Sequence, residues 1–69
     1  MPEITPSIGK AIRHFRVEID YSQTSLAKRS GLTQNLISAI ERGRIIPTEK
    51  ELSLIASAIR AARSKRASR

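Results

Sequence analysis

Residues 23–43, QTSLAKRSGLTQNLISAIERG, determine how this short chain folds. They are predicted to form two short helices joined by a tight turn. Ser22 and Thr33 each stand just before a helical pattern, where a hydroxyl side chain can accept a hydrogen bond from the first turn. Gly31 and Gly43 each follow such a pattern, and glycine readily adopts the left-handed conformation that ends a helix.

The spacing of small and apolar residues in this stretch adds a steric argument. Ala27 allows two helices to cross closely, Gly31 permits a sharp turn, and Ile37 and Ile40 would fill the angle between the helices. These are the steric requirements of a DNA-binding helix-turn-helix. The alternative is an ordinary helical hairpin, which shares any one of these features.

The same stretch and its flanks match a family pattern. The matching residues within it are Gln23, Leu26, Ala27, Gly31, Leu32, Thr33, Ile37, Ser38, Ile40, Glu41 and Gly43, followed by Pro47. Upstream the pattern includes Ile8, Gly9, Ile12, Arg13 and Arg16, and downstream it covers 52–59. In these residues the chain resembles the lambda-repressor-like helix-turn-helix family, the Cro and phage-repressor type of XRE-like transcriptional regulators. The resemblance covers residues 8–60, nearly the whole chain.

We therefore expect an all-α fold, a small bundle of four or five helices with a central helix-turn-helix. Three segments are predicted: an extended lead-in over 1–7, the DNA-binding domain over 8–63 and a basic tail over 64–69. A fourth helix should begin at Pro47 or Thr48.

Two apolar stripes are predicted to complete the core. The first helix should carry Ile8, Ile12, Phe15 and Ile19 on one face, with Phe15 at the centre of the core. The corresponding stripe of the fourth helix is Leu52, Ile55, Ala56 and Ile59.

Composition restricts the function. The 69 residues make one small domain without cysteine, and its single histidine, His14, offers no partner for a metal, so we expect neither metal nor cofactor. Thirteen Lys and Arg against six Asp and Glu give a net charge of +7, which favours a polyanionic partner. With Phe15 and Tyr21 as the only aromatics, single-strand recognition by stacking is poorly supported. No catalytic constellation can be assembled, so the chain is not expected to be an enzyme.

The sequence has neither an apolar run long enough to span a membrane nor a signal-peptide pattern. A cytoplasmic, nucleoid-associated protein is therefore expected.

The chain departs from the family pattern at two places. Members commonly have a glycine near Asp20, but aspartate tolerates left-handed geometry, so the turn is expected to survive. Members usually continue into a fifth, apolar helix that often forms the dimer interface, whereas residues 60–69 are basic and hold nothing large and apolar. The fourth helix is expected to extend to about Arg63 and then fray.

The basic tail is either a flexible arm on DNA or a solubilising end without a fixed partner.

The helix that begins at Gln34 is expected to lie in the major groove. Gln34 and Asn35 are the predicted base readers, because each amide offers a donor and an acceptor that match the N6 and N7 edge of adenine. Ser38, one turn later, is placed to reach a base or a phosphate. Leu36 either contacts a thymine methyl or packs in the core.

Phosphate contacts form a separate set that carries no sequence information. The predicted residues are Gln23 and Thr33 at the helix starts, Arg42 and Arg44 after the recognition helix, and Arg13 and Arg16 on the first helix. The resemblance also implies a charge pair between Arg16 and Glu41, which would orient Arg16.

The resemblance implies a homodimer on an inverted-repeat DNA operator, acting most simply as a repressor, although activation stays open. Leu54, Ala58 and Ala61 share a face that is either a dimer contact or only a core edge with good helix formers. The alternative function is an antitoxin or other protein-interaction module that covers a toxin or another protein partner, with autoregulatory DNA binding.

Overall fold

The computed structural model describes the backbone of residues 5–67 and the side chains of residues 8–65. Over this range the chain folds into α1 (Thr5–Glu18), α2 (Gln23–Ser30), α3 (Gln34–Glu41) and α4 (Glu49–Ala67). The predicted all-α fold is confirmed. None of these helices is long and apolar enough to cross a membrane.

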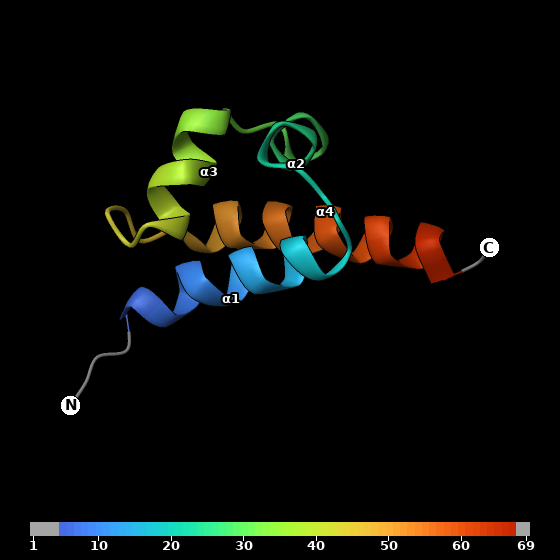
Figure 1. Cartoon of the computed structure of the whole chain (residues 1–69). Coiled ribbons are helices and arrows are strands. Elements are labelled where there is room, and N and C mark those ends of the chain that lie inside the picture. The colour runs from blue at the N-terminus through green and yellow to red at the C-terminus, as the bar shows by residue number, and fades with distance from the viewer. Residues whose placement is uncertain (1–4, 68–69) are drawn as a thin grey trace.

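The four helices form two layers. Figure 1 shows α2 and α3 lying above α1 and α4. Closely packed pairs are α1 with α3, α2 with α3 and α2 with α4, so α2 and α3 tie the lower helices together.

Local signals account for the turn between α1 and α2 and for the start of α4, which begins at Glu49 rather than at Pro47 or Thr48 as expected. Asp20 adopts a left-handed backbone (φ 54°) between α1 and α2, as expected for the residue that replaces the family's glycine. At the start of α4, the Glu51 N–H donates to the Thr48 hydroxyl (3.1 Å) and the Thr48 N–H donates to Oε1 of Glu51 (3.0 Å). This reciprocal pair is a capping box and fixes the first turn of α4.

The helix bounds differ from the prediction at both ends of the chain. α1 begins at Thr5, so 5–7 is helical rather than an extended lead-in, and 1–4 lies outside the described residues. α4 continues to Ala67, four residues past the expected end at Arg63. Arginine, lysine and alanine are strong helix formers, which lets the helix continue into the basic segment.

The described residues form one core, which lies between the two layers. Its buried apolar side chains are Ile12, Leu26, Ala27, Ile37, Ile40, Ile55, Ala58 and Ile59. Half of them come from α2 and α3.

The prediction that Phe15 is the centre of the core is wrong, because 44% of Phe15 is exposed. α1 turns the side that carries Gly9, Ile12 and Arg16 toward α3, and Phe15 lies off that side. Leu52 is also less buried than expected, with 36% of its surface exposed. Leu26, Ile37 and Ile40 fill the centre instead.

The predicted face of Leu54, Ala58 and Ala61 needs a similar correction. Ala58 is a core residue with 3% of its surface exposed, so it is not available for a dimer contact. Ala58 follows Ile55 by three residues and directly precedes Ile59, and all three are buried, which places Ala58 on the buried stripe of α4 under α2. Leu54 remains exposed and Ala61 is half-buried.

Candidate nucleic-acid interface

The turn between α2 and α3 is built from backbone hydrogen bonds and two caps. Gly31 takes φ 82°, and its N–H donates to the Ala27 carbonyl (2.9 Å), which closes α2. The Leu36 N–H then donates to the Thr33 hydroxyl (3.1 Å), which opens α3. At the other end of α2, the Ser25 N–H donates to the Ser22 hydroxyl (3.0 Å). The predicted caps and turn are confirmed.

The first turn of α3 presents polar side chains to solvent. Gln34 and Asn35 are exposed, and Ser38, one turn later, is half-buried. Ile37 and Ile40 on the opposite side are buried in the core. The helix is therefore held by its apolar side while its amides face solvent.

Leu36 lies between these two groups. It is half-buried and packs against the core cluster, which accounts for an apolar side chain at this position without a ligand. Of its two predicted roles, packing is therefore the one observed in this chain.

Thr24 on α2 holds the Gln34 amide. Its hydroxyl donates to Oε1 of Gln34 at 3.3 Å, across the angle between the two helices. The bond leaves the amide N–H₂ and one lone pair of the carbonyl oxygen for a ligand. No sequence pattern predicts this contact, because the pairing depends on how α2 and α3 cross.

Glu41 at the end of α3 joins three helices. Nε and Nη2 of Arg16 donate to its two carboxylate oxygens at 2.7 and 2.9 Å, in a bidentate pair that is almost completely buried. Nε2 of Gln23 donates to Oε1 of Glu41 at 3.0 Å. The Arg16–Glu41 pair implied by the family resemblance is present.

Arg16 is committed to this network. Its Nη1 donates to the Tyr21 carbonyl (2.8 Å), and only 12% of its side chain is exposed. The hydrogen bond to Glu41 is the main cause of the raised pKa of Arg16; attraction to the same carboxylate adds to it, and desolvation opposes it. The stability linked to this raised pKa is fully present when the pH lies below the ordinary pKa of arginine. It is lost only as the pH rises through the raised pKa of Arg16. Arg16 therefore holds α1 in place against α3. Because its donors are used in this network, it is a poor candidate for a phosphate contact.

Gly9 is a residue whose importance sequence reasoning missed. A Cβ atom at this position would lie 2.2 Å from the Ile40 carbonyl oxygen and 3.0 Å from that of Glu41. α1 therefore approaches the last turn of α3 more closely than any other residue type allows. The signal in the sequence was a glycine inside a helical apolar pattern.

Comparison with known proteins identifies the motif. A family model described as "Helix-turn-helix" matches residues 12–62, most of the chain. The chain belongs to this family. Within it, the lambda-repressor type named by the sequence pattern is confirmed.

The helix-turn-helix chain is similar to the "ImmF control region 10 kDa protein" of Bacillus phage phi105. The two are 41% identical over 49 residues, which cover 71% of this chain and 54% of the phage protein. The chain thus spans about half the length of this relative. No solved structure matches the present chain.

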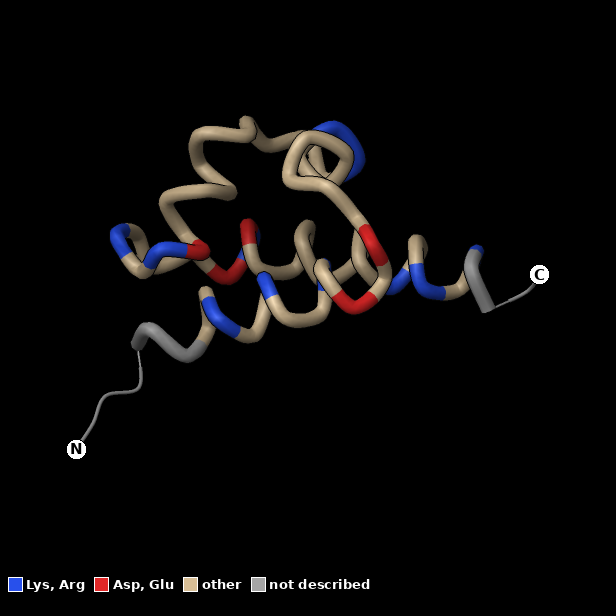
Figure 2. Tube along the Cα trace, viewed as in Figure 1, with Lys and Arg blue, Asp and Glu red and all other residues tan. Residues whose placement is uncertain are grey.

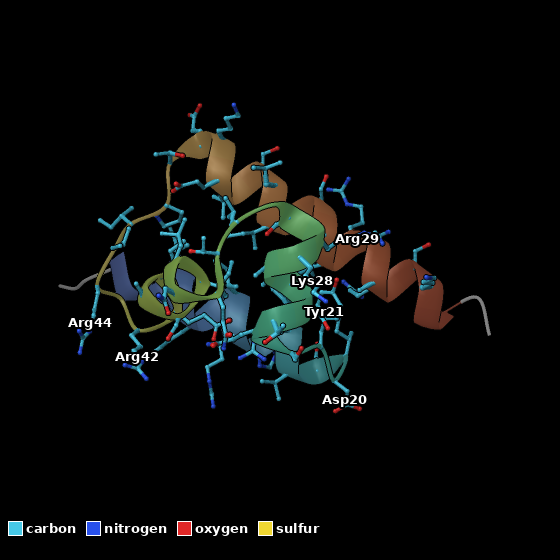
Figure 3. All side chains as sticks on the ribbon, turned by 90° about the horizontal axis from the view of Figure 1, so that it is seen from above. Asp20, Tyr21, Lys28, Arg29, Arg42 and Arg44 are labelled. Carbon is cyan, nitrogen blue, oxygen red and sulfur yellow. The ribbon has the colours of Figure 1, made fainter. Side chains whose placement is uncertain are left out.

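Membership in this family identifies the chain as a DNA-binding regulatory domain. Basic residues lie on several of its elements. Figure 2 shows positive charge on the loop after α3, on α2 and along the C-terminal half of α4. Arg42 and Arg44 project outward from the loop after α3 (Figure 3), and Arg13 on α1 is also exposed. Thr33, Gln34 and Asn35 are exposed with them, so most of the predicted contact residues reach the surface.

The described residues hold no cluster of three His, Cys, Asp or Glu side chains suited to a metal ion.

Proposed function

We propose that this chain is a sequence-specific reader of duplex DNA that represses transcription by occupying a promoter. The observation that carries the proposal is the exposed Gln34–Asn35 pair at the start of a helix whose other side is locked into the core. A helix held in this way can enter the major groove with its first residues against base edges. The similarity to a phage control-region protein supports a regulatory role.

Base reading is assigned to Gln34, Asn35 and Ser38. The Thr24 hydrogen bond orients the Gln34 amide before DNA arrives, so less side-chain freedom is lost on binding. Phosphate contacts are assigned to Arg13, Arg42 and Arg44, with Gln23 and Thr33 at the helix starts. Gln23 is held in place by Glu41, which fixes the beginning of α2 against the backbone of the duplex.

We place the chain on an inverted repeat as a homodimer, because a protein with two-fold symmetry matches an operator with two-fold symmetry. The half-sites would then lie roughly 34–36 Å apart. The dimer contact does not use Ala58, which is buried in the core of its own chain.

Selection of bound duplexes from a random pool tests the proposal. The native chain should enrich an inverted repeat, and Gln34→Ala should lose preference at one position in each half-site. A lost bidentate amide contact corresponds to roughly 1–3 kcal/mol of discrimination. Ser53→Ala, a change at an exposed residue of α4, is the control and should select the same sequence. An unchanged preference in Gln34→Ala would contradict the assignment of Gln34.

A further inference from the structure

An apolar groove of about 440 Å³ runs between α1 and α4, and we call it the α1–α4 groove. Its floor is formed by the core residues Ile12, Ile55 and Ile59, and its walls include Phe15 and Leu52. These two wall residues are 44% and 36% exposed, although both are large and apolar. The rotation of α1 that removes Phe15 from the core thus creates an open apolar surface.

The groove exists because α1 and α4 do not pack closely on each other. Each packs instead on a helix of the upper layer, α1 on α3 and α4 on α2. None of the residues that line the groove belongs to α2 or α3, which cover one side of the α1–α4 pair (Figure 1), so we place the groove on the side away from the helix-turn-helix. An occupant of the groove would leave the exposed side of α3 free.

One rim of the groove is positively charged. Arg60 and Arg63, both exposed on α4, line the groove, and among the described side chains no acidic one lines it. The surface therefore complements an apolar ligand that carries negative charge along one flank.

A second copy of this chain fits the groove poorly. Two grooves meeting across a two-fold axis would bring four arginines into one interface, and the chain as a whole carries +7. The same arrangement would place the two helix-turn-helix units on opposite sides of the dimer, where they could not share one face of a duplex.

We propose that the α1–α4 groove is a docking site for an amphipathic helix of another protein, with acidic residues along the flank that meets Arg60 and Arg63. The wall from Ile8 to Phe15 is about 10 Å long at 1.5 Å per residue. This length accommodates two turns, so the ligand helix would insert apolar anchors at i, i+3, i+4 and i+7. Docking on this side lets the protein hold DNA and its partner at the same time.

The test uses a labelled helical peptide of about 14 residues, long enough for two to three turns and a cap at each end. It carries leucines at i, i+3, i+4 and i+7 and glutamates along one flank. A matched peptide keeps the leucines and replaces the glutamates with lysines. Fluorescence anisotropy at about 0.15 M salt, where long-range attraction is screened, measures binding of each to the full chain.

Two pairs of variants separate docking from general attraction to a basic protein. Arg60→Glu together with Arg63→Glu should weaken binding of the acidic peptide by about tenfold and improve binding of the lysine peptide. Lys10→Glu with Lys50→Glu makes the same change in net charge at exposed positions outside the groove and should leave both affinities unchanged. Ala56→Lys, an exposed change in the groove, should abolish binding of the acidic peptide, whereas Leu54→Lys on another face of α4 should not. Circular dichroism and thermal unfolding verify that each variant is folded.

Four results would overturn the proposal. Three are equal binding of the acidic and lysine peptides, equal loss in the two charge-reversed pairs, and no binding of either peptide. A fourth is self-association of the chain that Ala56→Lys abolishes in sedimentation equilibrium, which would make a second copy the occupant. The inference is independent of the proposed operator reading, since Gln34→Ala should bind the acidic peptide as the native chain does.

Discussion

At the scale of single residues, Gly9 sets the distance between α1 and α3. In an open helical position, replacing glycine with alanine gains about 1 kcal/mol of helix propensity. At Gly9 the new methyl group would meet the Ile40 carbonyl oxygen at 2.2 Å, and backbone cannot move aside as a flexible side chain can. We expect Gly9→Ala to reduce the free energy of unfolding by about 1–3 kcal/mol, the usual cost of overpacking.

Urea unfolding followed by circular dichroism measures this loss. Ser57→Ala, at an exposed position of α4, is the control for helix propensity and should be neutral or slightly stabilising. A Gly9→Ala protein as stable as the native chain would show that α1 and α3 can separate at no cost.

Glu41 is the second residue on which the fold depends. Only 3% of its side chain is exposed, and removing one member of a buried ion pair costs about 3–5 kcal/mol. A domain of this size has a total stability of about 3–10 kcal/mol. Glu41→Ala should therefore lose a large part of the free energy of unfolding.

A double-mutant cycle measures the Arg16–Glu41 interaction directly. Arg16→Met, Glu41→Leu and the double variant are compared by urea unfolding, and the double variant should recover much of the stability lost by either single one. Additive losses would mean that the two side chains stabilise the fold independently. Removal of Gln23's amide by Gln23→Ala should cost less, since the charge pair stays intact.

At the scale of helical elements, the Thr24–Gln34 hydrogen bond joins α2 to α3, and under the proposed function it orients the Gln34 amide for DNA. Thr24→Val keeps the side-chain shape but removes the hydroxyl. We expect this change to weaken operator binding by about 0.5–1.5 kcal/mol, the net value of one hydrogen bond, with little effect on folding because both side chains are exposed.

The comparison with Gln34→Ala shows whether Thr24 acts through Gln34. Gel-shift titrations of Thr24→Val, Gln34→Ala and the double variant on the selected operator are combined in a cycle. The double variant should bind as Gln34→Ala does. Fully additive effects would assign Thr24 a separate contact with DNA.

At the scale of the whole molecule, the net charge of +7 makes binding depend on salt. Cations that neutralise phosphates release condensed counterions, so the slope of log affinity against log salt falls by about 0.9 for each lost contact. Arg44→Ala should lower this slope without changing the selected sequence, because phosphate contacts carry no base information.

Lys50→Ala provides the matched control, since it removes one exposed positive charge from the first turn of α4. Its slope should equal that of the native chain. Equal slopes for Arg44→Ala and the native chain would remove Arg44 from the DNA interface.

Local signals in the sequence were sufficient for the motif. Caps at Ser22 and Thr33, and the left-handed turns at Asp20 and Gly31, depend on neighbouring residues only, and all four are present. Exposure of Gln34 and Asn35 also follows from local periodicity, because the apolar residues of α3 must face inward.

Only the tertiary structure decided how each helix is rotated and which of its side chains are buried. An apolar stripe shows that a helix has a buried side but leaves its rotation open within a turn, and the close approach at Gly9 fixes that rotation for α1. Phe15 consequently leaves the core and becomes a wall of the α1–α4 groove, while Ala58 enters the core under α2. Glu41 gathers Arg16 and Gln23 from two other helices, 25 and 18 residues away in sequence. The sequence by itself thus determined the helices and the exposure of the proposed reading residues, and only the packing of one helix on another determined which side chains support them.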